Sequence, residues 1–155
     1  MSFPSMHNIG ALIQSVFGTA NAALTAGGAG DDTEVVGNII DRLVSTNMAL
    51  SAVAAIKFKA VLAAAKTLSI AYTIEHGDDP ALADAAAFAS AVSTVVATGP
   101  AGGGTVYGVD EIDLDLAGAK RYLRLRFTPD LNAANTDTAE CAGMWTFGGS
   151  PEIPV

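Results

Sequence analysis

The sequence has few of the side chains that catalysis and metal binding most often use. Its 155 residues include one cysteine and two histidines, and aromatic residues make up 6%. The single cysteine, Cys141, excludes an internal disulfide and a metal site built from cysteines alone. His7 and His76 are the only near-neutral bases, and no Gly-x-Ser-x-Gly motif is present. The sequence therefore predicts no enzyme activity, no cofactor and no metal.

Positive charge and long apolar runs are also scarce. Lys and Arg total 8 against 16 Asp and Glu, and the resulting net charge of −8 opposes binding to nucleic acid. No stretch reaches the roughly 18 uninterrupted apolar residues of a membrane span. Residues 9–25 are the most apolar early segment, but polar residues interrupt it and no Lys or Arg precedes it. The sequence predicts neither a nucleic-acid nor a membrane partner, and no secretory signal.

What the sequence does contain is a set of short runs that alternate apolar and polar residues. The clearest are Leu68–Glu75, Ile112–Leu116 and Leu123–Phe127. Alternation gives a strand one buried and one solvent-exposed face. We predict an all-β fold, an antiparallel β-sandwich of jelly-roll-like form with about seven or eight strands. The alanine-rich residues 80–88, which begin with Pro80, predict at most a short helical turn.

The length suits one domain with its own core. We expect an N-terminal arm and first strand over residues 1–27. The sandwich is expected over 28–148, and a C-terminal tail over 149–155.

The most charged strands are expected at 105–116 and 120–128, as a hairpin. That pairing would place Glu111 opposite Arg124, where opposite charges stabilise a sheet. The carboxylates of 110–115 resemble a calcium loop but lack its central glycine and closing glutamate. These carboxylates fit the solvent-exposed face of a strand better.

Other side chains also have structural explanations. The run Ala52–Val61 is expected to place its apolar residues on one face and Lys57 and Lys59 on the other. Cys141 is expected to be a buried thiol. Trp145 suits either the core or a subunit contact, because aromatic residues are enriched in both.

Four segments resemble small structural proteins from the head modules of tailed bacteriophages. They read GAGDDTEVVGNIIDR (28–42), KTLSIAY (66–72), TGPAGGGTV (98–106) and LAGAKRYLRLRFTPDL (116–131). The similarity covers roughly residues 28–148 and consists of strand and turn patterns without a catalytic signature. Residues 82–97 depart from it, because they are unusually rich in alanine.

The resemblance implies a jelly-roll-like capsid decoration, or cement, protein. Such proteins lie on the outer surface of the virion, across seams between major capsid protein subunits, and often act as dimers or trimers. It therefore implies two partners, the major capsid protein and further copies of this chain. The protein would be made in the host cytoplasm. No active site is implied.

We expect contacts through the two terminal segments and through a basic strand. The candidate contact residues are Phe3, Pro4, Met6, Tyr122, Arg124, Arg126, Pro151 and Ile153. An unpatterned arm over residues 2–10 can become ordered on a neighbour when bound. For the basic strand, pairing with an acidic strand of the same chain and contact with an acidic partner are both open.

Two other functions fit the same fold. A carbohydrate-binding module on the virion surface would need exposed aromatic rings. Tyr122 is the ring expected to be exposed, whereas Tyr72 shares the apolar face of its strand. A head–tail or tail structural subunit is the other alternative.

Overall fold

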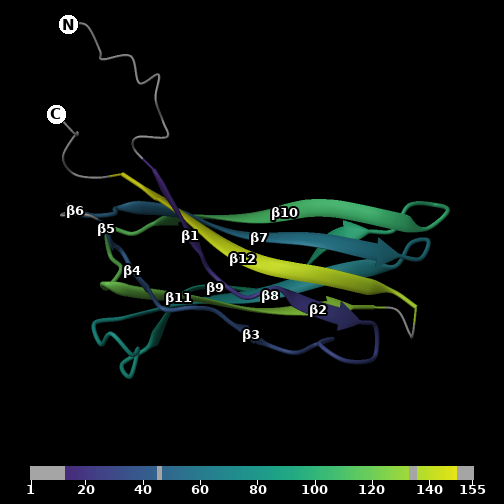
Figure 1. Ribbon diagram of the computed structural model, residues 1–155, viewed down its shortest axis with the longest axis horizontal. Coiled ribbons are helices and arrows are strands. Elements are labelled where there is room, and N and C mark those ends of the chain that lie inside the picture. The colour runs from purple at the N-terminus through teal and green to yellow at the C-terminus, as the bar shows by residue number, and fades with distance from the viewer. Residues whose placement is uncertain (1–12, 45–46, 133–135, 150–155) are drawn as a thin grey trace, which may run out of the picture.

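The computed structural model describes residues 13–44, 47–132 and 136–149, which form two antiparallel β-sheets packed face to face (Figure 1). Sheet A has the strand order β10-β7-β12, and β1 and β2 both pair with the other side of β12. Its strands are β1 (Gln14–Phe17), β2 (Ala22–Thr25), β7 (Ser51–Leu62), β10 (Gly104–Asp115) and β12 (Thr138–Gly148).

Sheet B has the order β9-β8-β11, and β3 and β4 both pair with the other side of β11. Its strands are β3 (Val35–Val36), β4 (Ile40–Asp41), β8 (Thr67–Gly77), β9 (Ala86–Thr98) and β11 (Tyr122–Leu131). A two-stranded ribbon, β5 (Leu43–Val44) with β6 (Asn47–Met48), lies outside both sheets.

The predicted all-β antiparallel sandwich is confirmed. Ten strands form its two sheets, more than the seven or eight expected. Six of the ten are long, and the count exceeds the expectation because the residues before β7 form four short strands, β1 to β4, of two to four residues each. Alternation over so few residues is too brief to identify a strand from sequence.

Residues 80–88 form turns followed by the start of β9, with no helical turn. Asp84 accepts hydrogen bonds from the N–H groups of Asp78 and Asp79, and Asp79 accepts one from Ala81. Side-chain acceptors of this kind offer the backbone an alternative to a helix. Across the described ranges no helix occurs, and so none is suited to cross a membrane.

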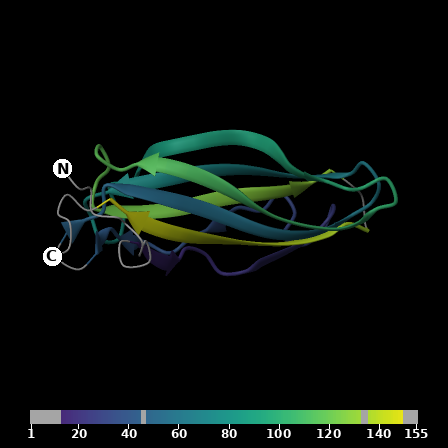
Figure 2. The same cartoon turned by 90° about the horizontal axis from the view of Figure 1, so that it is seen from above.

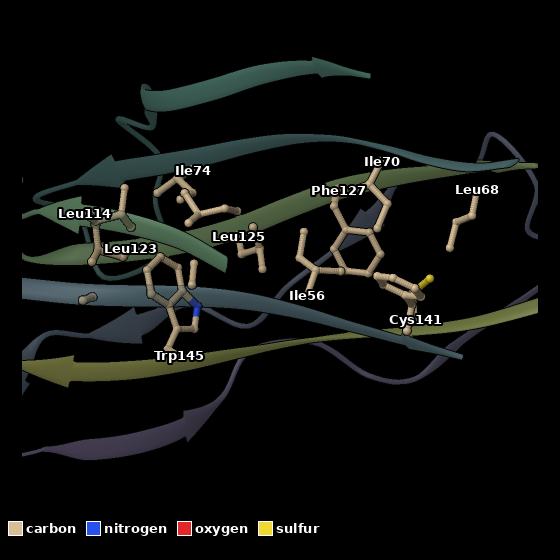
Figure 3. Close-up of a cluster of buried hydrophobic side chains, with 14 of the residues drawn as sticks. Ile56, Leu68, Ile70, Ile74, Leu114, Leu123, Leu125, Phe127, Cys141 and Trp145 are labelled. Atoms are coloured by element: carbon tan, nitrogen blue, oxygen red, sulfur yellow. The ribbon is translucent and has the colours of Figure 1, made fainter. Parts of the chain in front are cut away.

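The core lies between the sheets and is built from the inward-facing half of each alternating strand (Figure 3). Trp145 is fully buried and stacks on Phe147 with ring centroids 5.4 Å apart. It lies opposite Ala54 in the register, and that small side chain leaves room for the indole. From sheet B, Phe127 projects into the same core and lies beside Ile56 (Figure 3). Trp145 is thus a core residue, one of the two expectations for it.

The predicted hairpin between 105–116 and 120–128 is wrong. β10 pairs with β7, and β11 pairs with β8, so the two strands lie in different sheets. Arg124 faces Glu75 rather than Glu111. Both strands have one apolar face, and crossing between the sheets turns those faces toward each other in one core. Alternation fixes which side chains are buried but leaves the partner strand open.

A buried arginine, Arg42, holds the segment that crosses from β10 to β11 by hydrogen bonds. Arg42 is 4% exposed and donates hydrogen bonds to the carbonyl oxygens of Ala49, Leu116 and Ala119. Main-chain carbonyls, rather than a carboxylate, accept from its two terminal nitrogens, and its buried Nε has no partner among the described residues. The residues between β10 and β11 are thereby fixed to the segment before the β5–β6 ribbon.

Candidate interaction surfaces

The eight candidate contact residues divide into two groups. Five lie in terminal segments outside the described residues, and their roles stay predictions: Phe3, Pro4, Met6, Pro151 and Ile153. The structure brings the other three, Tyr122, Arg124 and Arg126, together on the outer face of sheet B, on β11.

Carboxylates of the same chain neutralise both arginines. A guanidinium nitrogen of Arg124 lies 2.6 Å from Oε2 of Glu75, and one of Arg126 lies 2.9 Å from Oε1. Arg126 also pairs with Glu34. Burial by itself raises the pKa of Glu75, but hydrogen bonds from Arg126 and Arg124 outweigh it and hold that pKa below its ordinary value. The two arginines pair within the chain, but the expected pairing with the acidic strand over residues 110–115 is wrong, because that strand lies in the other sheet.

The neighbouring cations are paired in the same way. Lys120 Nζ lies 2.9 Å from Asp84 and 3.4 Å from Asp78. Arg121 lies 2.7 Å from Asp41, and its hydrogen bond to that carboxylate, stronger than the opposing effect of burial, lowers the pKa of Asp41. The basic strand thus offers little unmatched charge to a partner.

The tyrosine expected to be exposed is a different one. Tyr122 is half-buried, with the Arg121 guanidinium 5.2 Å from its ring centroid, so the expectation for Tyr122 is wrong. Tyr72 is half-buried and packs against the core. Tyr107 on β10 is 71% exposed.

Tyr107 belongs to the outer face of sheet A, where apolar side chains meet unpaired cations. Lys57 and Lys59 project outward from β7, as their alternation predicted. Neither has an ion pair with any described residue. Val109 and Phe17, both more than half exposed, lie on the outer strands of the same sheet. The strand order β12-β7-β10 can be followed in Figure 2.

A shallow hollow of about 460 Å³ lies within this face. It is lined by Asn21, Lys57, Phe58, Lys59, Tyr107, Gly108, Val109 and Glu140. Gly108 lies opposite Phe58 in the register, and the close packing of these two residues requires a glycine, because a Cβ atom at position 108 would lie 2.3 Å from the Phe58 ring. Sequence reasoning placed the lysines outward but gave no sign of the hollow, which depends on β10 lying beside β7.

The two terminal segments are attached to the same end of the sandwich. Gln14, in the first strand, pairs with Phe147, near the end of the last. The start of β1 and the end of β12 therefore lie side by side (Figures 1 and 2).

Two titratable residues singled out from the sequence, Cys141 and His76, are held by burial or by contacts within the fold. Cys141 is fully buried, and desolvation raises the pKa of its thiol to about 12. Nδ1 of His76 accepts a hydrogen bond from the Lys120 N–H, and its ring packs on Phe88. Within the described ranges, no three His, Cys, Asp or Glu side chains are grouped to hold a metal ion.

No family profile and no curated protein sequence matches this chain. Among solved structures, it is similar to XepA, an exported protein of PBSX, at 20% identity and a TM-score of 0.42. That match covers 97% of this chain and 41% of XepA, so the chain spans less than half of that protein. It is also similar to the coat protein of Tobacco streak virus, at 14% identity and a TM-score of 0.31, over 99% of this chain and 95% of the coat protein. Both resemblances are distant and concern the fold.

Proposed function

We propose that this protein is a structural virion protein that decorates a phage capsid. It would lie on the outer surface and bind across seams between major capsid protein subunits. In this role it acts by contact alone, without catalysis or a cofactor. The sequence resemblance over residues 28–148 supports this proposal.

The observation that carries it is the pairing of Gln14 with Phe147. The candidate contact residues Phe3, Pro4 and Met6 precede the first of these, and Pro151 and Ile153 follow the second. The two segments that carry these residues therefore join the sandwich at neighbouring positions. A small contact there suffices on a shell, because linked copies bind repeated sites with avidity.

A pull-down on intact and on disassembled capsids tests this role. Purified protein is incubated with each, and bound copies are counted by gel densitometry. We expect saturable binding to intact shells, in a simple ratio to the major capsid protein. Absence of binding to intact shells would overturn the proposal, and binding to isolated tails instead would assign the protein to the tail.

A second comparison assigns the contact to the terminal segments. A variant without residues 2–10 should lose shell binding while keeping the circular dichroism spectrum and unfolding midpoint of the full chain. A matched control replaces residues 2–10 with glycine and serine at unchanged length. Undiminished occupancy by either variant would remove the arm from the contact.

The exposed ring of Tyr107 beside the hollow favours one second candidate, binding of a carbohydrate. Sugars stack on exposed aromatic rings, and Asn21 and Glu140 in the hollow supply hydrogen-bonding groups. A glycan array would show binding that Tyr107→Ala abolishes and Tyr107→Phe retains. No signal on the array, together with shell binding, would decide for the capsid role.

A further inference from the structure

We propose that the outer face of sheet A is a self-complementary surface on which two copies of this chain pair, with their strands antiparallel. The two-fold axis would lie between the two faces and run across the strands. This pairing does not require shell binding and is tested separately from it.

The charge on this face changes sign along the strands. One half carries Lys57 opposite Val109 and Lys59 opposite Tyr107 in the β7–β10 register. The other half carries carboxylates, with Glu111 opposite Ala55 and Asp113 opposite Val53. All four charged side chains are exposed and have no ion pair with any described residue.

A two-fold axis between these halves places the lysines of one copy over the carboxylates of the other. The cross-strand level that carries Lys57 in one copy then lies over the level that carries Glu111 in the other copy. In the same way, the level of Lys59 lies over the level of Asp113. The matched groups come from neighbouring strands about 4.8 Å apart, a lateral offset that a lysine side chain spans. Electrostatic complementarity of this kind fixes the register of two surfaces.

The lysine half also contains one carboxylate, Glu140, and the proposed axis does not place it against a carboxylate of the second copy. Glu140 lies beside Lys59, on β12. The same axis places Glu140 over Thr146 of the second copy, since Thr146 lies opposite Val53. The antiparallel arrangement thus brings no carboxylate of this face against another.

The shape of the face supports the same arrangement. Phe17 and Met144 lie opposite each other at the boundary between the two halves and are 62% and 43% exposed. They form an exposed apolar pair on the carboxylate side, next to the hollow of about 460 Å³ on the lysine side. The two-fold axis turns the apolar pair of each copy toward the hollow of the other.

The available area suits a modest dimer. From a strand spacing of about 4.8 Å and a rise of about 3.3 Å per residue, the face covers roughly 600 Å² on each copy. The total of roughly 1,200 Å² reaches the lower end of specific interfaces. Pairing through the free edge of β10 is disfavoured, because Asp110 lies on the inward side of that strand, between the exposed Val109 and Glu111, and inward charges protect edges from added strands.

In each sandwich Gln14 and Phe147 lie side by side at one end. An antiparallel dimer would therefore place this pair of residues at its two opposite ends. Under the proposed capsid role, one dimer reaches two subunits on either side of a seam.

Light scattering and sedimentation of the full chain test the pairing. We expect a species of twice the 15.6 kDa chain mass that dissociates on dilution and more readily at high salt. A chain that stays at 15.6 kDa at high concentration would overturn the proposal.

Charge exchange identifies the face. Lys57→Glu with Lys59→Glu, and separately Glu111→Lys with Asp113→Lys, should each weaken the dimer by at least ~10-fold through like-charge contacts. An equimolar mixture of the two variants should restore a mixed dimer, which also shows that both are folded. Lys66→Glu, an exposed site outside the face, is the control and should have no such effect. A dimer that both double variants leave intact, or a mixture that stays monomeric, would overturn the assignment.

Discussion

On the outer face of sheet B, Arg124 and Arg126 each form an ion pair with a carboxylate, whereas on the outer face of sheet A Lys57 and Lys59 form none with any described residue. The two faces arise from the same alternation of apolar and polar residues. They differ in which charges the strand registers bring together. The outer charges of β11 in sheet B therefore form ion pairs within the chain, whereas Lys57 and Lys59 on sheet A remain available for contact with a second copy, as proposed above.

Substitutions in the core should affect both faces alike and set the upper limit of the stability changes. Trp145→Ala beneath sheet A and Phe127→Ala beneath sheet B should each lower the free energy of unfolding by about 3–5 kcal/mol, because each leaves a large cavity. Urea unfolding measures both. A loss below about 1 kcal/mol at either site would contradict a shared, well-packed core.

The carboxylates of the two faces should differ in their contribution to stability. Glu75→Ala leaves the half-buried guanidinium of Arg124 without a carboxylate and that of Arg126 with Glu34 alone, and it should cost about 1–3 kcal/mol. Glu111→Ala, on sheet A, should change stability by less than about 0.5 kcal/mol. Equal losses in urea unfolding would erase the distinction between the faces.

The pH dependence of stability should also depend on Glu75. Its folded pKa lies below the ordinary value of 4.5, so the folded state favours the ionised form. The resulting stabilisation is present above pH 4.5 and is lost as the pH falls through the lower folded pKa. Glu75→Gln should remove this part, so that the variant loses less stability than the natural chain between pH 7 and pH 3. Identical pH profiles would show that the carboxylate is not stabilised by its arginines.

The smallest stability effect is expected at Tyr107. Its ring is exposed, and Tyr107→Ala should change the free energy of unfolding by less than about 0.5 kcal/mol. The same substitution should weaken self-association, because it removes part of the wall of the hollow. Thermal unfolding at low protein concentration and sedimentation at high concentration separate the two effects. A large loss of stability would assign Tyr107 to the fold of the monomer.

Strand positions and the facing of individual side chains follow from the sequence wherever alternation is long. Lys57 and Lys59 point outward, and the even-numbered residues from Leu68 to Ile74 point toward the core or pack against it. The candidate site was predictable only in part. The sequence indicated Tyr122 as an exposed ring, but Arg121 covers it, and the exposed ring is Tyr107.

An all-β chain with one buried and one solvent-exposed face on each long strand follows from the order of residues alone, because side-chain direction in a strand repeats every two residues. The placing of β10 beside β7 and of β11 beside β8 depends on how the strands pack together. Many pairings bury the same apolar faces equally well, and compact packing of all the strands together selects among them. That choice gave Arg124 its carboxylate partner, left Lys57 and Lys59 unpaired, and formed the hollow between them and Tyr107.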